Sequence, residues 1–133
     1  MTIHENMTLE EVRAFFAQDR FATDAGMTVE EARPGFARCS LVLNEHHKNA
    51  MGGVMGGVHF TLADLAFAVA SNLGGRPTVN VHASIQYLSA VKGETLSAEA
   101  HCRKDGRSLC FYDVEISSEG RLCALVTITG SHV

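Results

Sequence analysis

One stretch of the chain, GGVMGGVHFTLADLAFAVA at residues 52–70, places a single carboxylate among apolar side chains. Taking an ionised carboxylate out of water is costly unless it is paired or hydrogen-bonded. Asp64 therefore either reaches solvent or caps a neighbouring loop, or it is held in a partly desolvated cleft, where a carboxylate can act as a general base or as a nucleophile. The residues alone leave these two interpretations open.

The glycines before Asp64 favour the chemical interpretation. Gly56 and Gly57 fall at the start of a predicted helix, where free N–H groups and the positive end of the helix dipole can polarise a carbonyl or hold an oxyanion. Asp64 follows Gly56 by eight residues, which is about 12 Å along a helix. One carbonyl cannot contact both groups of the same chain. If both act on it, the site lies between two antiparallel copies of this helix, and the protein is an obligate dimer.

Composition limits the class of protein. The 133 residues include 46% hydrophobic and 20% charged residues, which predicts one globular domain over residues 1–133. A net charge of −4 argues against a nucleic-acid partner or a polybasic membrane contact, and the longest apolar run is far shorter than the roughly 20 residues that span a bilayer. Since the polar N-terminus lacks a secretory signal and the four cysteines form no CxxC pair, we expect a reduced, cytoplasmic protein.

The helices are indicated by signals at their ends. A capping box of Thr8 and Glu11 begins a helix that is predicted to end near Phe21. The glycine-rich segment 44–57 is expected to be a loop. The apolar segment 57–73 is predicted to be a long helix, which GGRP at residues 74–77 ends. Because this helix is apolar nearly all round, the sheet must curl around it or a second subunit must cover the remainder.

The strands are indicated by alternation. Polar and apolar residues alternate along 78–89, which predicts a strand with Asn80 and His82 on its polar face. Further strands are expected at residues 27–32, 36–43, 95–103, 107–117 and 121–129. The joins after residues 89, 103 and 117 are too short for helices and resemble hairpins, so the sheet is antiparallel. The predicted fold class is α+β, with an N-terminal helix, one long helix and a sheet of about five or six strands.

The segment HKNAMGGVMGGVHFTLAD at residues 47–64 resembles the H-x-N-x-x-G-x-x-H-G-G-x-x-x-x-L-A-D signature of hotdog-fold acyl-CoA thioesterases. The similarity continues through VNVHASIQYLSAVKGETLSAEA and DGRSLCFYDVEI, and it is nearest to the phenylacetate-degradation (aromatic-compound) group. The resemblance implies a long central helix wrapped by a curved antiparallel sheet. It also implies a homodimer at least, often a homotetramer, which hydrolyses an aryl- or fatty-acyl-CoA and needs no metal or other cofactor.

The resemblance further implies roles for individual residues. Asp64 matches the catalytic carboxylate and Gly56 the glycine whose N–H polarises the thioester carbonyl, the two coming from different subunits. Asn49 matches the loop asparagine that positions the substrate or the lytic water. Asn80 occupies the position where relatives often have a serine or threonine that helps to hold this water. The other candidate substrate contacts are Met55, Gly57, His82, Arg103, Lys104 and Arg107.

One residue departs from the signature. Met55 stands where the family has a histidine, and a thioether cannot donate a hydrogen bond or carry a proton. Methionine can serve if that histidine only shapes the loop, whereas activity should be weakened or redirected if it assists the carbonyl. This departure motivates an alternative function, a non-catalytic hotdog dimer that binds acyl-CoA or an aromatic ligand. A dehydratase of acyl thioesters is a third possibility, although that chemistry usually relies on the missing histidine.

The remaining candidates have ordinary structural interpretations as well. His46, His47 and His59 lie close in sequence, but without H-x-x-x-H spacing they are interpreted as surface histidines rather than as a metal site. His59 is also a candidate to replace the missing imidazole in part. The basic residues around 103–107 either keep a hairpin end soluble or contact CoA phosphates. Phe60 and Phe67 are expected in the core.

Overall fold

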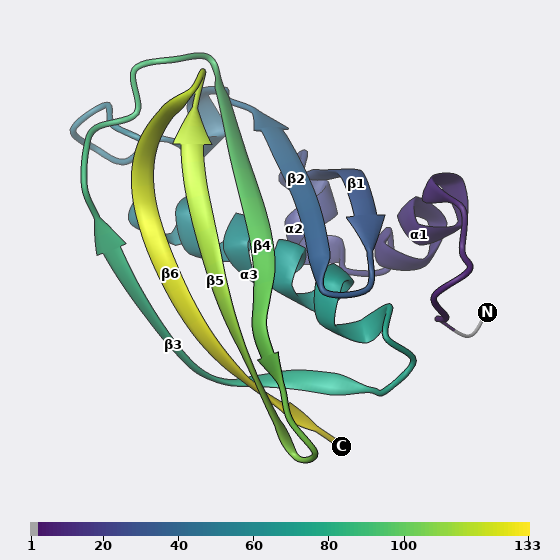
Figure 1. Cartoon of the computed structure of the whole chain (residues 1–133). Helices are drawn as coiled ribbons and strands as arrows, with labels where there is room; N and C mark the ends of the chain where they lie inside the picture. The colour runs from purple at the N-terminus through teal and green to yellow at the C-terminus, as the bar shows by residue number, and fades with distance from the viewer. Residues whose placement is uncertain (1–2) are drawn as a thin grey trace.

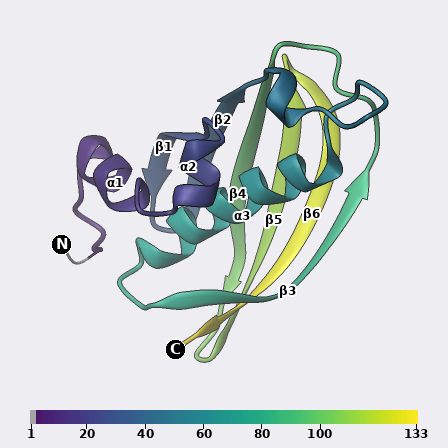
Figure 2. The ribbon, with the colours of Figure 1, turned by 180° about the vertical axis from the view of Figure 1, so that it is seen from behind.

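The computed structural model describes residues 3–133, so the first two residues of the predicted 1–133 domain lie outside the described part. A curved sheet wraps around one long helix, α3 (Gly56–Asn72), and the N-terminal helix α1 (Leu9–Phe16) lies against strand β1 (Thr28–Arg33) (Figure 1, and from behind in Figure 2). The helices are α1 (Leu9–Phe16), α2 (Arg20–Asp24) and α3 (Gly56–Asn72), with a 3-10 turn η1 (Glu45–His47). The strands are β1 (Thr28–Arg33), β2 (Phe36–Val42), β3 (Thr78–Tyr87), β4 (Thr95–Asp105), β5 (Leu109–Ser118) and β6 (Arg121–His132). Among residues 3–133, no helix is both long and apolar enough to cross a membrane.

The sheet confirms the predicted α+β architecture and corrects one connection. Its six strands follow the order β1-β2-β4-β5-β6-β3, and every neighbouring pair is antiparallel. The joins β4–β5 and β5–β6 are hairpins as predicted. The hairpin predicted after β3 is wrong, because β3 pairs with β6 at the edge of the sheet. The chain then crosses the end of the sheet to reach β4, and the N–H groups of Leu88 and Ser89 both donate to the Cys123 carbonyl on the way, at 2.8 and 3.2 Å.

The core lies between α3 and the concave face of the sheet. Ala63, Ala66 and Ala70 are fully buried, and these small side chains let the strands approach the helix closely. Phe67 packs edge-on against Tyr112 of β5, with the ring centroids 5.2 Å apart. The sheet therefore curls around most of the helix, as the apolar character of the segment requires.

One face of α3, which we call the open stripe, stays uncovered. It consists of residues that recur every three or four positions and are exposed or half-buried, namely Gly57, Phe60, Thr61, Asp64 and Ala68. Phe60 is 37% exposed, so the expectation that it lies in the core is wrong, whereas Phe67, at 1%, is buried as predicted. The carboxylate of Asp64 thus lies on the face of the helix that the sheet leaves open.

The N-terminal helix is shorter than predicted. Its capping box is present, with Thr8 N–H donating to Glu11 Oε1 at 2.9 Å and Glu11 N–H donating to Thr8 Oγ1 at 3.2 Å. The helix does not continue to Phe21, because α1 ends at Phe16 and a separate α2 follows. A longer α1 would place the polar Asp19 one turn after Phe16 on the same face of the helix. The added turn would therefore bury no apolar side chain at that position.

Gly130 of β6 faces α3 and has no room for a side chain. A Cβ at this position would lie 2.6 Å from Cys110 Sγ and 2.7 Å from the Phe67 ring. We expect Gly130→Ala to lower the free energy of unfolding by about 1–3 kcal/mol, the usual cost of overpacking a core, as measured by urea denaturation. Gly74→Ala is the control, since the nearest atom to a Cβ there lies at 3.8 Å. Equal losses in the two variants would contradict this packing argument.

Candidate active site

Asp64, on the open stripe of α3, is held by β3. Asn80 Nδ2 donates to Asp64 Oδ1 at 3.0 Å, so the structure brings these two predicted site residues together. Both residues are half-buried. Among residues 3–133, no side chain or backbone group donates to the second oxygen, Oδ2. The carboxylate is therefore oriented through one oxygen, and the other is available to a water or a substrate.

A β-bulge at Val81 points Asn80 toward α3. Asn80 pairs with Gly130, and His82 pairs with the next residue of β6, Thr129, so Val81 is the extra residue. Because successive residues of a strand point to opposite faces, Asn80 faces the helix with Gly130, and His82 faces away with Thr129. The expectation that Asn80 and His82 share a face is wrong, because the bulge shifts the alternation by one residue.

A cavity of about 300 Å³ opens beside Asp64. Its wall includes the apolar side chains of Phe21, Phe60 and Leu65 and the carboxyl group of Asp19, which lies between α1 and α2. Burial raises the pKa of Asp19, and the negative charge of Asp64 raises it further. Sequence analysis missed Asp19, because only the packing of α2 against α3 brings it to this cavity. Arg20 and Thr61 also line the cavity, so its wall has a polar and an apolar part. The apolar part, next to an oriented carboxylate, suits an apolar group attached to a reacting carbonyl.

The start of α3 supplies backbone donors. Met55 is the N-cap residue, but its side chain makes no capping hydrogen bond and is 57% exposed. Within residues 3–133, the N–H groups of Gly56 and Gly57 have no acceptor, whereas the Val58 N–H donates to the Met55 carbonyl at 3.0 Å. Two free donors at the positive end of a helix dipole can bind an anionic oxygen.

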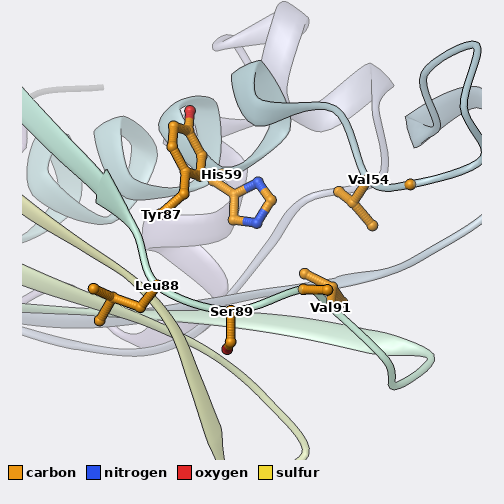
Figure 3. Close-up of a pocket in the computed structure, with 8 residues that line it drawn as sticks. Val54, His59, Tyr87, Leu88, Ser89 and Val91 are labelled. Carbon is orange, nitrogen blue, oxygen red and sulfur yellow. The ribbon is translucent and has the colours of Figure 1, made fainter.

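A second cavity, of about 400 Å³, adjoins this end of α3. Figure 3 shows Tyr87 and His59 side by side at this cavity. The Tyr87 hydroxyl donates to the Gly56 carbonyl at 2.8 Å, and the His59 ring packs edge-on against the Tyr87 ring, with Nδ1 3.3 Å from the Met55 carbonyl. His59 is buried, so its interpretation as a surface histidine is wrong, and burial lowers its pKa. Its imidazole is therefore mainly neutral at pH 7.

The loop before α3 is held by two of its own side chains. Asn49 Oδ1 accepts from the N–H groups of Met51 at 3.0 Å and Gly53 at 3.1 Å, so Asn49 shapes the loop and makes no hydrogen bond to the Asp64 carboxylate. His47 is buried, contrary to expectation. Its Nδ1 accepts from one backbone N–H at 3.0 Å and its Nε2 donates to a backbone carbonyl at 2.6 Å. The loop is thereby fixed in front of the glycines.

The predicted CoA-phosphate contacts lie elsewhere in the chain. Arg103, Lys104 and Arg107 are at the β4–β5 hairpin, near the C-terminus in Figure 1. This hairpin is hydrogen-bonded to the segment before β3, whereas Gly56 contacts the last residue of β3. Arg103 also pairs with Asp113 at 2.6 Å. The structure does not bring the basic hairpin to Gly56 within one chain.

The chain thus carries two groups that suit one kind of chemistry. A carboxylate with a free oxygen is suited to activate water or attack a carbonyl, and paired N–H donors are suited to stabilise an oxyanion. About 12 Å along α3 separates the two groups, so one carbonyl cannot contact both within a single chain. Such groups on a long helix inside a curved antiparallel sheet fit the hydrolysis of esters and thioesters.

Comparison with known proteins identifies the family. Residues 51–124 match the family described as the Thioesterase superfamily. Human acyl-coenzyme A thioesterase 13 is 35% identical over 74% of this chain and 74% of the relative. The acyl-coenzyme A thioesterase PaaI of Escherichia coli is 31% identical over 83% of this chain and 79% of the relative. The chain belongs to the thioesterase superfamily.

Solved structures agree with this assignment and confirm the hotdog fold. The structure of the E. coli PaaI protein, from the phenylacetic acid degradation operon, superposes with a TM-score of 0.87 at 28% identity, covering 93% of this chain and 91% of the other. A thioesterase protein from Streptococcus pneumoniae, solved with coenzyme A, superposes with a TM-score of 0.81 at 27% identity, covering 89% and 96%.

The proximity of Asp64 and Asp19 can be tested by titration. We expect Asp64→Asn to lower the pKa of Asp19, because it removes a negative charge, but not to the usual aspartate value, because burial remains. NMR titration of the Asp19 side-chain carboxyl carbon in both proteins measures the change. Asp24→Asn, on the exposed side of α2, is the control and should leave this pKa unchanged. An Asp19 pKa that stays the same or rises in Asp64→Asn would contradict the arrangement.

Proposed function

We propose that the protein is an acyl-CoA thioesterase that hydrolyses an aryl- or fatty-acyl-CoA to the free acid and CoA. Membership of the thioesterase superfamily makes it a thioester hydrolase. Two relatives named acyl-coenzyme A thioesterase and a neighbouring structure solved with coenzyme A support acyl-CoA as the substrate. The observation that carries the catalytic assignment is the Asn80–Asp64 hydrogen bond of 3.0 Å beside a cavity that Phe21, Phe60 and Leu65 line on one part of its wall.

A homodimer unites the two halves of the site. β3 is an edge strand, and Val79, Val81 and Tyr87 along it are 47%, 55% and 52% exposed. A free strand edge beside the open stripe of α3 offers both backbone hydrogen-bond groups and apolar area to a second copy. Two-fold contacts of this isologous kind are the commonest in soluble oligomers.

The same two-fold axis is consistent with α3 and with β3. In an antiparallel helix pair, Gly56 faces the partner subunit's Asp64 when the axis passes Phe60, which lies halfway between them. Along β3, Asn80 contacts Asp64 and Tyr87 contacts Gly56. These two residues pair with Gly130 and Ala124 of β6, and Thr127, halfway between those partners, pairs with Ser84, so the corresponding axis passes Ser84. On α3 and on β3 alike, the axis thus passes midway between the Asp64 position and the Gly56 position.

In this dimer the thioester lies between the Gly56 N–H of one subunit and the partner subunit's Asp64. The N–H binds the carbonyl oxygen and stabilises the oxyanion. The partner's Asp64 takes a proton from water as the water attacks the carbonyl carbon, or attacks the carbon itself to give an anhydride that water then hydrolyses. The C–S bond breaks, and the CoA thiolate leaves and takes up a proton. Asn80 holds Oδ1, so that Oδ2 is directed to the reaction.

The other candidate residues take supporting roles in this proposal. Asn49 keeps the loop in the conformation that exposes the glycine N–H groups, and Met55 and Gly57 line the approach to them. The basic hairpin of residues 103–107 contacts the CoA phosphates of a substrate bound across subunits. His82 is left out of the site because it faces away from α3.

We further propose one domain over residues 1–133, a homotetramer built from two such dimers, and a cytoplasmic role in phenylacetate degradation. The PaaI structure from the phenylacetic acid degradation operon supports the pathway. The four cysteines are all free, which suits a reducing compartment.

Asp64→Ala tests the reaction. We expect kcat to fall by about 10²–10⁴-fold, the usual contribution of a general base, with little change in the melting temperature. Free-thiol release from a panel of aryl- and fatty-acyl-CoAs measures turnover and also ranks the acyl groups. Asp24→Ala is the matched control and should keep full activity. Undiminished turnover in Asp64→Ala would sink the catalytic assignment.

Phe60→Glu tests the shared site. Two carboxylates would meet at the two-fold axis, so we expect this contact to open and leave a folded, inactive protein of lower mass. Sedimentation equilibrium reports the mass, circular dichroism the fold and thiol release the activity. Val42→Glu introduces the same charge at a position of β2 that is 72% exposed, and should keep the wild-type mass and activity. A Phe60→Glu protein that keeps the wild-type mass, or one that dissociates and stays active, would refute the shared site.

A further inference from the structure

Tyr87 makes a contact that the catalytic assignment does not use. Its hydroxyl donates to the Gly56 carbonyl at 2.8 Å. Its ring stands edge-on to the buried His59 ring, with centroids 5.2 Å apart (Figure 3). Strand β3 thereby holds the first turn of α3 at the point where the proposed oxyanion donors lie.

The Gly56 carbonyl and the Gly57 N–H belong to the same peptide unit. A hydrogen bond accepted by a carbonyl polarises its peptide and strengthens the N–H of that peptide as a donor. The Gly57 N–H has no acceptor within residues 3–133, so the added donor strength is available to a ligand. The bond from Tyr87 also fixes the plane of this peptide, and with it the direction of the N–H.

A neighbouring hydroxyl shows how selective this arrangement is. Thr61 Oγ1 donates to the Gly57 carbonyl at 2.8 Å, which belongs to the peptide of the Val58 N–H. That N–H already donates to the Met55 carbonyl at 3.0 Å. Of the two side-chain hydroxyls bonded to this turn, Tyr87 is the one that acts on a peptide with a free donor.

We propose that Tyr87 is a positioning residue of the hydrolysis: it orients and polarises the Gly56–Gly57 peptide, so that the Gly57 N–H joins the Gly56 N–H as a second donor to the oxyanion. This inference rests on the proposed function. It also explains why residue 56 is glycine, because a Cβ there would lie 2.7 Å from the Tyr87 hydroxyl oxygen and 3.0 Å from its ring carbon Cζ.

Tyr87→Phe tests the proposal, because it removes the hydroxyl and keeps the ring. With the acyl-CoA that the wild type hydrolyses best, we expect kcat to fall about tenfold, less than the 10²–10³-fold that follows outright loss of an oxyanion donor. KM and the melting temperature should change little, since the hydroxyl acts on the oxyanion and not on CoA. In NMR spectra of the free protein, the Gly57 amide proton should shift upfield as its peptide loses polarisation.

Ser118→Ala is the matched control. Its hydroxyl also donates to a backbone carbonyl, that of Thr95 at 2.6 Å, but it lies on β5 and touches no peptide of α3. This variant should keep the wild-type kcat even if its melting temperature falls. A kcat for Tyr87→Phe that is unchanged, or lowered no more than in Ser118→Ala, would overturn the inference, as would an effect on KM alone.

A double-mutant cycle gives a second readout that does not depend on turnover. We expect Gly56→Ala to lower the melting temperature in the wild-type background and to lower it less in Tyr87→Phe, where the closest atom has been removed. Equal losses in both backgrounds would contradict the contact. Failure of the proposed function has a different signature: a wild type that hydrolyses no acyl-CoA, or an Asp64→Ala variant that retains turnover, would remove the reaction on which the role of Tyr87 rests.

Discussion

A helix that is apolar on nearly every side requires cover from nearly every side, and this requirement shapes the fold. α3 lies in the concave face of six strands, and the small side chains of Ala63, Ala66 and Ala70 allow close contact. A single sheet cannot close around the helix completely, so one stripe remains open. Asp64 lies on that stripe, where its carboxylate escapes full burial and still borders apolar walls. The incomplete cover of the helix thus also determines where the candidate catalytic carboxylate lies.

The sequence predicts those features that depend on interactions between neighbouring residues, such as the ends of helices. The glycines and GGRP bound α3 to within one residue at each end, and the capping box of Thr8 and Glu11 forms as predicted. What the sequence does not reveal depends on contacts between distant segments. β3 lies at the edge of the sheet because it pairs with β6. His47 can be buried because backbone groups form hydrogen bonds with both of its ring nitrogens. Asp19 has no local signal at all, since its place beside Asp64 depends on how α2 packs.

The proposed site combines two opposite electrostatic features of a single helix. The start of α3 offers free N–H groups at the positive end of the dipole, and the middle of the helix carries a carboxylate whose field reaches Asp19. Strand β3 serves both regions, through Asn80 at one end and Tyr87 at the other. One strand therefore sets the geometry of the nucleophilic half and of the oxyanion half, which keeps the two in register when copies of the chain meet.

The bulge at Val81 means that the backbone pairing of β3 decides a property that residue identity does not. Val81 has no partner on β6, so many side chains can be accommodated there. If Val81 were instead paired with Thr129, as in a regular strand, every residue between Thr78 and Asn80 would reverse its facing relative to the rest of the strand, and Asn80 would turn away from Asp64. Removing Val81 would leave the pair of Asn80 and Gly130 in place and keep Asn80 on the side of Asp64. The orientation of the carboxylate therefore depends on where the backbone of β3 leaves regular pairing, and not on which side chain stands at position 81.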